Sequence, residues 1–211
     1  LSSSAAVEVA MAYAFQVIGG FELDGVTRAL LCQKAENDFV GMNCGIMDPF
    51  IVSLGQRGHA LLIDCRSLEY TPVPVPSGCD VIICDTKKRR GLVDSEYNRR
   101  REECERGAAI LGVKALRDVS LQELVSRRKD MDEITFQRCQ HVVSENERTV
   151  EAVNTLGAGD LKRFGELMNA SHISLRDDYQ VSCAELDAMV SAAWAQEGTS
   201  PAGGASGNRS R

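Results

Sequence analysis

The first eighteen residues constrain the fold more than any other stretch of the chain. Leu1 to Ser4 place three consecutive serines before a mostly apolar run that ends at Gly19 and Gly20. Because serine is a favoured N-cap and glycine a favoured helix terminator, we predict a helix from Ser2 to Ile18. Apolar residues occupy nearly every face of this helix, which predicts that it is buried. The free backbone N–H groups of its first turn are suited to holding a phosphate.

The chain starts inside this feature, with neither a methionine nor a preceding strand. We therefore expect residues before Leu1 to be missing, together with the first part of a phosphate-binding loop. A core truncated in this way would expose apolar surface and lower the solubility of the chain.

Composition indicates a soluble globular protein of the cytoplasm. The 211 residues are 44% hydrophobic and 26% charged, and they allow one large domain or one domain with part of another. The net charge of -6 disfavours broad nucleic-acid binding, and no apolar run is long enough to span a membrane. The eight cysteines include no CxxC pair and are interpreted as reduced thiols. His59, His141 and His172 have no metal-ligand spacing.

The remaining chain predicts a small sheet followed by helices, an α+β fold class. Strand patterns cover residues 59–64, 68–75 and 80–85, and alternating prolines in the second strand favour a sheet edge. Helical patterns cover residues 26–39, 94–111, 120–127, 132–156, 160–175 and 182–196. The Gly/Ser/Ala-rich tail 198–211 is expected to be disordered.

Two acidic residues stand out after the serines. Glu36 lies near the end of the second predicted helix, and Asp48 follows the glycine-containing loop Cys44–Met47. Because Pro suits the first helical position, we predict Asp48 to be the N-cap of a short helix that ends at Leu54. If Asp48 instead lay inside a helix, the following Pro49 would cost about 3 kcal/mol and tilt the carboxylate.

In this order and at these separations, the segments resemble the galactokinases, sugar kinases of the GHMP superfamily. Family sequences carry Gly-Leu-Ser-Ser-Ser-Ala, Ala-Glu-Asn and Cys-Gly-Ile-Met-Asp, matched here by residues 1–5, 35–37 and 44–48. The resemblance continues through residues 61–70, 94–100, 169–172 and 174–179, and it is collinear over residues 1–197.

The resemblance implies a GHMP-kinase-like two-domain fold that is truncated at both ends. Residues 1–90 would be the rest of an N-terminal domain that binds ATP and sugar, and residues 91–197 an incomplete C-terminal domain, followed by the tail 198–211. The family's N-terminal Glu-His-Thr-Asp segment, its supporting arginine and its C-terminal glycine-rich motif have no counterpart here. We therefore expect this chain to be inactive alone.

The resemblance also implies a phosphotransferase with an alcohol acceptor, which uses ATP and Mg²⁺ to convert galactose to galactose 1-phosphate. We expect it to be a monomer with these small-molecule partners and with no nucleic-acid or membrane partner. The implied site comprises a phosphate loop (Leu1, Ser2, Ser3, Ser4), magnesium ligands (Ser4, Glu36), a catalytic carboxylate (Asp48) and galactose contacts (Gly45, Asp48, Tyr97). Pro49 departs from the family, which has Gln after the catalytic Asp.

Three alternatives remain open from sequence. The chain could belong to a non-catalytic paralogue that senses galactose and ATP, or to a GHMP kinase for a related sugar such as N-acetylgalactosamine. It could also be a cytosolic α/β scaffold with a helical interaction region, which predicts no protection by nucleotide against thermal unfolding.

Overall fold

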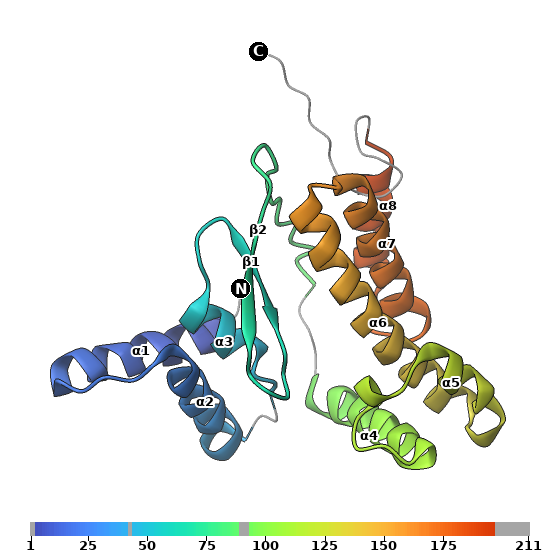
Figure 1. Ribbon diagram of the computed structural model, residues 1–211, viewed down its shortest axis with the longest axis horizontal. Coiled ribbons are helices and arrows are strands. Elements are labelled where there is room, and N and C mark those ends of the chain that lie inside the picture. Colours follow the sequence, from blue (N-terminus) through green and yellow to red (C-terminus); the bar gives the residue numbers. More distant parts are fainter. Residues whose placement is uncertain (1–2, 42–43, 89–92, 197–211) are drawn as a thin grey trace. The chain divides into compact units, whose positions relative to one another are not determined.

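The computed structural model describes residues 3–41, 44–88 and 93–196, excluding the side chains at positions 93–95 and 97. Leu1, Ser2, the tail 198–211 and the predicted domain boundary near residue 90 lie outside this range. The chain divides into two compact units, residues 1–75 and 76–211 (Figure 1). Together they contain one two-stranded sheet and many helices, which confirms the predicted α+β class.

The first unit contains three helices and a hairpin. Its elements are α1 (Ser3–Gly19), α2 (Gly25–Ala35), a π-helical turn (Glu36–Val40), α3 (Met47–Leu54), β1 (His59–Ile63) and β2 (Tyr70–Pro74). The predicted helix 26–39 is therefore wrong in its last turn, where the hydrogen bonding widens before Gly41 ends the segment at a φ of 84°.

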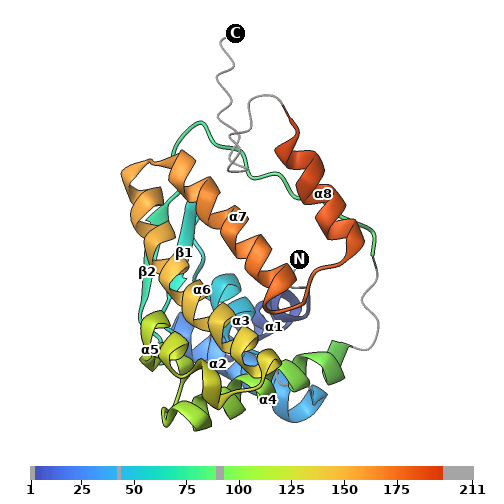
Figure 2. The ribbon, with the colours of Figure 1, turned by 90° about the vertical axis from the view of Figure 1, so that its right-hand side faces the viewer.

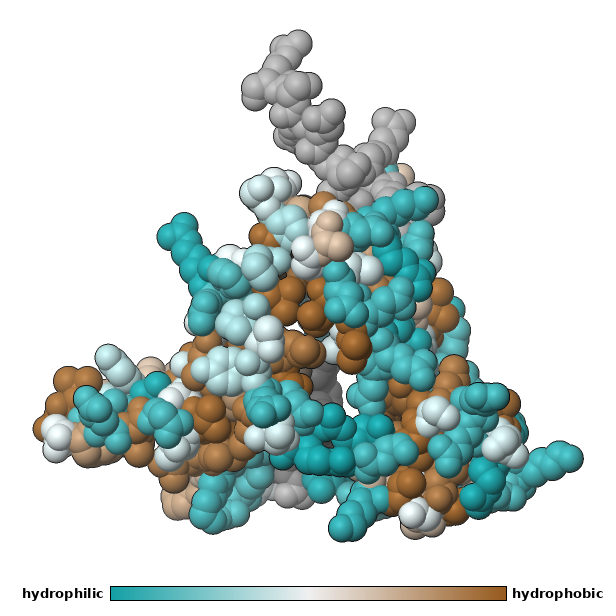
Figure 3. All heavy atoms as spheres, viewed as in Figure 1, coloured by the Kyte–Doolittle hydropathy of each residue, from teal (hydrophilic) through white to brown (hydrophobic). Residues whose placement is uncertain are grey.

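Helix α1 buries less surface than its sequence predicts. Within the first unit it packs on α2 and α3, and only Ala5 and Val9 are buried. The prediction of a buried helix is wrong for the described residues. The helix is apolar on every face, but only one side of it packs against other elements. Figure 3 shows hydrophobic surface over α1. The exposed apolar side chains of α1 are Val7, Met11, Tyr13, Phe15, Val17 and Ile18.

Helices α2 and α3 approach closely at Gly25. A Cβ atom at this position would lie 2.3 Å from Cδ2 of Leu54, so any other residue here would require the Leu54 side chain to shift. Ser53 Oγ donates to the Gly25 carbonyl (2.8 Å) and accepts from Arg28 Nε (3.1 Å). Since Gly25 begins α2 and Leu54 ends α3, the C-terminal end of α2 and the N-terminal end of α3 lie together.

Phe50 is the centre of the first core. Its side chain is fully buried beside Ala29 and Ile46, and its ring meets the Tyr70 ring edge-on at 5.5 Å. The apolar residues around this core are Val26, Leu54, Leu61, Ile63 and Leu68.

The hairpin confirms that the second predicted strand is an edge. Its strands are antiparallel, with His59 opposite Pro74, and Val75 N–H donates to the Gly58 carbonyl (2.9 Å). Residues alternate along a strand, so Pro72 and Pro74 turn their nitrogens away from β1 and remove no ladder bond.

The third predicted strand, 80–85, is wrong. No described strand pairs with these residues, which have no regular secondary structure and are exposed at Val81, Ile82 and Ile83. β-branched composition favours a strand only where a neighbouring strand supplies hydrogen bonds.

The second unit is helical. It contains α4 (Val93–Leu111), α5 (Leu121–Ser126), α6 (Glu133–Ala158), α7 (Leu161–Asp177) and α8 (Ala184–Trp194). The helices predicted for this unit are confirmed to within a few residues. Asp132 accepts from Thr135 N–H (2.9 Å) at the start of α6, and Gly159 ends that helix at a φ of 73°. Asp160 then caps α7, which lies beside α6 in Figure 2.

Helices α4 and α6 pack closely at Gly107, which has no side chain. A Cβ atom at Gly107 would lie 2.1 Å from the Cys139 sulfur, and burial raises the pKa of the Cys139 thiol to about 12. The second core consists of Ala108, Leu116, Val119, Leu124, Met131, Phe136, Cys139 and Val143.

All eight cysteines of the chain are free thiols. Within the described part of the chain, no helix is both long and apolar enough to cross a membrane.

A buried histidine links α6 to the end of α7. His141 Nδ1 lies 3.0 Å from Ser174 Oγ, and that hydroxyl donates to Asp178 Oδ2 (2.7 Å). Because the Ser174 hydroxyl donates its hydrogen to Asp178, the hydrogen in the contact between His141 and Ser174 must be carried by His141 Nδ1. The Tyr179 ring stacks on the imidazole at 4.5 Å. Burial lowers the pKa of His141.

We expect Phe50→Ala to destabilise the chain by about 3–5 kcal/mol, because it leaves a cavity in the first core. Phe39→Ala is the matched control, since the Phe39 side chain is 93% exposed and its loss should change the free energy of unfolding by less than about 0.5 kcal/mol. Urea unfolding measures both, and equal effects would contradict the assignment of this core.

We expect the free energy of unfolding to fall as the pH falls below about 6.5, the pKa of histidine in an unfolded chain. The folded pKa of His141 is lower, so the unfolded state binds more protons in this range and protonation favours unfolding. His141→Gln should remove this part of the pH dependence between pH 7 and pH 5. His59→Gln, at an exposed position on β1, should not. Identical pH dependence in the two variants would refute this interpretation.

Candidate active site

The predicted site residues lie at helix ends in the first unit, with one exception. Ser3 and Ser4 form the exposed first turn of α1, Glu36 begins the π-helical turn, and Asp48 is the second residue of α3. Leu1 and Ser2 lie outside the described residues. Gly45 is exposed just before α3, and Tyr97 is on α4 in the second unit, with its side chain outside the described part.

Glu36 is nearly buried against a second carboxylate. Its residue is 8% exposed, and its side chain forms a hydrogen bond with Glu8, which lies one turn after Ser4 on α1. This hydrogen bond, burial and the charge of Glu36 raise the pKa of Glu8 to about 7. Residues four apart share a helix face, so Ser4 and Glu8 present adjacent oxygen atoms along one side of α1.

The sequence prediction missed Glu8. Its signal was present, because a glutamate four residues after a candidate phosphate-binding serine lies on the same helix face. The pairing with Glu36 depends on how α1 packs on α2, which the sequence pattern does not specify.

The loop before α3 is fixed by side chains of α2 and the π-helical turn. Asn37 Oδ1 accepts from Cys44 N–H (2.9 Å), and Gln33 Nε2 donates to the Cys44 carbonyl (3.2 Å). Both polar groups of one peptide residue are thus tied to the segment that carries Glu36. These contacts position the loop that leads into Asp48.

The Cys44 thiol lies within the electrostatic influence of three carboxylates. Its pKa is raised first by burial and then by the negative charges of Glu36, Glu8 and Asp48. The structure therefore gathers the predicted acidic residues, with Glu8 added, around one loop. The gathering follows from the antiparallel packing of α2 and α3 described above.

The prediction that Asp48 caps α3 is wrong. The N-cap is Ile46, and the first helical bond runs from Phe50 N–H to the Ile46 carbonyl (2.9 Å). Asp48 and Pro49 both lie in the first turn, where backbone N–H groups have no partner inside the helix. Pro49 therefore removes no helical bond and does not cost 3 kcal/mol, and the Asp48 carboxylate lies at the positive end of the helix dipole.

The oxygen atoms at this site fit a hard cation such as Mg²⁺. The Ser4 hydroxyl and the Glu36 carboxylate are suitable donors, and the neighbouring Glu8 adds negative charge. Among the described residues, no group of three or more His, Cys, Asp or Glu side chains forms a metal site. Mg²⁺ commonly binds one or two carboxylates and completes its shell with waters and phosphates, so the donors here are compatible with it.

Comparison with known proteins shows which proteins have a similar sequence and fold. Residues 1–56 match the GHMP kinases N terminal domain. The whole fold is similar to the crystal structure of Lactococcus lactis galactokinase complexed with galactose, with 35% sequence identity and a TM-score of 0.88. The first 56 residues are thus similar to a GHMP kinase domain, and the fold is similar to that of a galactokinase. The similarity covers 92% of this chain and 52% of the galactokinase, so the chain spans about half the length of that enzyme.

We expect Glu8→Gln to stabilise the chain by about 1 kcal/mol at pH 8, after allowing for solvent screening of the partly exposed pair. The folded pKa of Glu8 is raised from 4.5 to about 7, so the folded state binds more protons between these values. Its stability then falls as pH rises from about 4.5 to about 7.

Thermal unfolding at pH 5 and pH 8 tests this, with the exposed Glu22→Gln as control. A gain at pH 5 equal to that at pH 8 would contradict repulsion between the two carboxylates.

Proposed function

We propose that the chain carries the nucleotide and acceptor sites of a galactokinase. This enzyme would transfer the γ-phosphoryl group of ATP to the anomeric hydroxyl of galactose and yield galactose 1-phosphate. The observation that supports it most is the placement of Glu36 and Asp48 around one loop, in a chain 35% identical to a galactokinase solved with galactose.

The start of α1 would hold the phosphates of ATP. The N–H groups of its first turn have no partners within the helix, and the hydroxyls of Ser3 and Ser4 are exposed beside them. Phosphoryl transfer depends mainly on positioning and on charge stabilisation, which helix N–H groups supply.

Ser4 and Glu36 would hold Mg²⁺ together with the phosphates. The ion would neutralise charge on the β- and γ-phosphate oxygens. Glu36 suits this role because its burial against α1 fixes its rotamer, whereas an exposed glutamate on a helix surface would not be held.

Asp48 would orient the acceptor hydroxyl and accept its proton. The carboxylate is exposed, so a ligand can reach it, while α3 is anchored by the buried Phe50 two residues later. A Cβ atom at Gly45 would meet no atom within 4 Å, which leaves open space beside Asp48 for a sugar. Tyr97 would supply a further galactose contact. We infer a monomeric cytoplasmic enzyme.

The decisive experiment is a chimera in which this chain replaces the matching half of Lactococcus lactis galactokinase. We expect galactose-dependent release of ADP from MgATP, and we expect Asp48→Asn to lower kcat about 10²–10⁴-fold because it removes the proton acceptor. Asp38→Asn is the matched control, since Asp38 is exposed and pairs with Lys34 on the surface.

Each other outcome of this assay contradicts part of the proposal. Binding of both ligands without ADP release would indicate a sensor. Faster turnover of N-acetylgalactosamine than of galactose would indicate a different acceptor. ADP release by the chain without the other half would contradict the expectation that it is inactive alone.

A further inference from the structure

The turn that follows α7 is closed by three backbone hydrogen bonds to the end of that helix. The N–H groups of Asp178 and Tyr179 both donate to the Ser174 carbonyl (2.9 Å). The N–H group of Val181 donates to the Leu175 carbonyl (2.9 Å). The turn leads directly into α8, in which none of the described residues is buried. Burial of α8 therefore does not hold the turn closed, and its closure depends on contacts with α4, α6 and α7.

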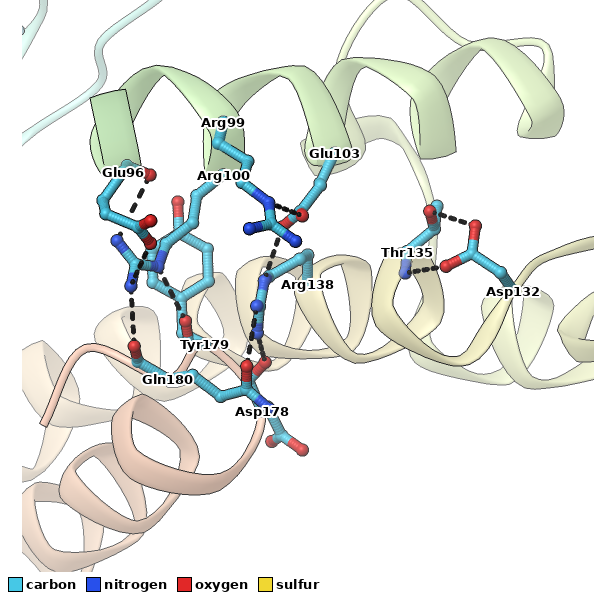
Figure 4. A network of polar contacts seen from close by, with 10 residues as sticks. All are labelled: Glu96, Arg99, Arg100, Glu103, Asp132, Thr135, Arg138, Asp178, Tyr179 and Gln180. Carbon is cyan, nitrogen blue, oxygen red and sulfur yellow. Dashed lines mark hydrogen bonds and ion pairs between the residues drawn. The ribbon is translucent and has the colours of Figure 1, made fainter. Parts of the chain in front are cut away.

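Two arginines from other helices hold the backbone of this turn (Figure 4). Arg138 on α6 donates to the Asp178 carbonyl (2.5 Å). Arg100 on α4 donates to the carbonyls of Tyr179 (3.1 Å) and Gln180 (2.7 Å). These contacts oppose strain, because Gln180 has a φ of 56°, a left-handed conformation that residues other than glycine seldom adopt. Such a conformation persists only where its surroundings impose it, so the loss of one contact favours opening of the turn.

The contact that can change with pH is the one with His141 on α6. This residue is 6% exposed, and the Tyr179 ring stacks on its imidazole at 4.5 Å. His141 Nδ1 donates to Ser174 Oγ (3.0 Å), and that hydroxyl donates to Asp178 Oδ2 (2.7 Å). The Tyr179 side chain also forms a hydrogen bond with Cys104 on α4. One buried imidazole thus contacts the turn through both an aromatic ring and a hydroxyl group.

The charged groups around this imidazole already have partners. On α6, the Glu145 carboxylate lies 2.7 Å from the Arg148 guanidinium. The Arg138 guanidinium lies 2.8 Å from the carboxylate of Glu103 on α4, and the Asp178 carboxylate accepts its hydrogen bond from a serine hydroxyl. Burial outweighs the nearby carboxylates and lowers the pKa of the imidazole. A positive charge on this ring is therefore unfavourable while the turn is closed.

We propose that His141 and the turn at residues 178–181 form an acid-sensitive latch. While the imidazole is neutral, it stays buried against Tyr179 and the turn is closed. Because Nδ1 already carries a hydrogen, a further proton is added at Nε2. The charged ring then requires solvent, which reaches it when Tyr179 moves away and the strained turn opens. The latch lies wholly in the second unit and would operate whatever reaction the chain supports.

The open turn should gain population as the pH falls below about 6.5, the pKa of a histidine exposed to solvent. The open form binds the proton more tightly, so the ratio of open to closed turn rises by at most about tenfold for each pH unit. Hydrogen-exchange protection of the N–H groups of Asp178, Tyr179 and Val181, relative to an unstructured peptide at the same pH, should fall about threefold or more between pH 7 and pH 5. Protection in the middle of α6 should not change.

Variants can assign this response, because the chain contains only three histidines. His141→Gln keeps an N–H donor for Ser174 but takes up no proton in this range, so the protection of its turn should be equal at pH 7 and pH 5. His172→Gln is the matched control, since His172 Nε2 lies 3.3 Å from Asp187 Oδ1 on α8, a contact that protonation strengthens. This control should keep the full response. Loss of the response in His172→Gln alone, or an unchanged response in His141→Gln, would overturn the proposal.

A second measurement keeps the test valid if His141→Gln folds poorly. In the unchanged chain, an NMR titration follows the three imidazoles together with the backbone N–H groups of residues 178–181. The signals of the turn should change with the same midpoint as the His141 imidazole. A midpoint shared with His172 instead, or a loss of protection across the whole second unit at the same pH, would overturn the proposal.

Discussion

The close contact between α2 and α3 is the constraint on which the candidate site depends. Because Gly25 has no side chain, Leu54 packs against the backbone of α2. At the same end, Ser53 forms hydrogen bonds with Arg28 and with the Gly25 carbonyl. Because the helices run antiparallel from this contact, Glu36 and Asp48 are brought to the opposite end. A side chain at Gly25 would displace the Leu54 side chain from this contact.

Gathering negative charge in this way is unfavourable, and the structure shows how it is tolerated. Glu8 and Glu36 share a hydrogen bond that favours a proton between them, and the start of α3 offers Asp48 a positive helix end. A site that binds a divalent cation and a polyphosphate has the same requirement, since the cation offsets carboxylates that otherwise repel each other. In the second unit, Arg100 and Arg138 donate hydrogen bonds to the three backbone carbonyls of the turn at residues 178–180.

Much of the fold could be predicted from local sequence, and the rest depended on packing. Ser120, Asp132 and Asp160 cap helices at the starts of the predicted ranges, because a cap needs only its own neighbours. The strand at 80–85 and the burial of α1 were wrong, since both depend on a partner elsewhere. Glu36 and Asp48 could be named from their spacing, but Glu8 became visible only once α1 was packed on α2.

Burial and the charges of nearby carboxylates raise the pKa of the Cys44 thiol. A raised pKa leaves little thiolate at neutral pH, and thiolate is the form that reacts with oxidants and alkylating agents. Cys65 and Cys84, which are exposed, meet such reagents first. The loop beside the proposed acceptor site can therefore carry a cysteine without becoming a point of oxidative damage, because burial, with the neighbouring negative charges, keeps its sulfur protonated.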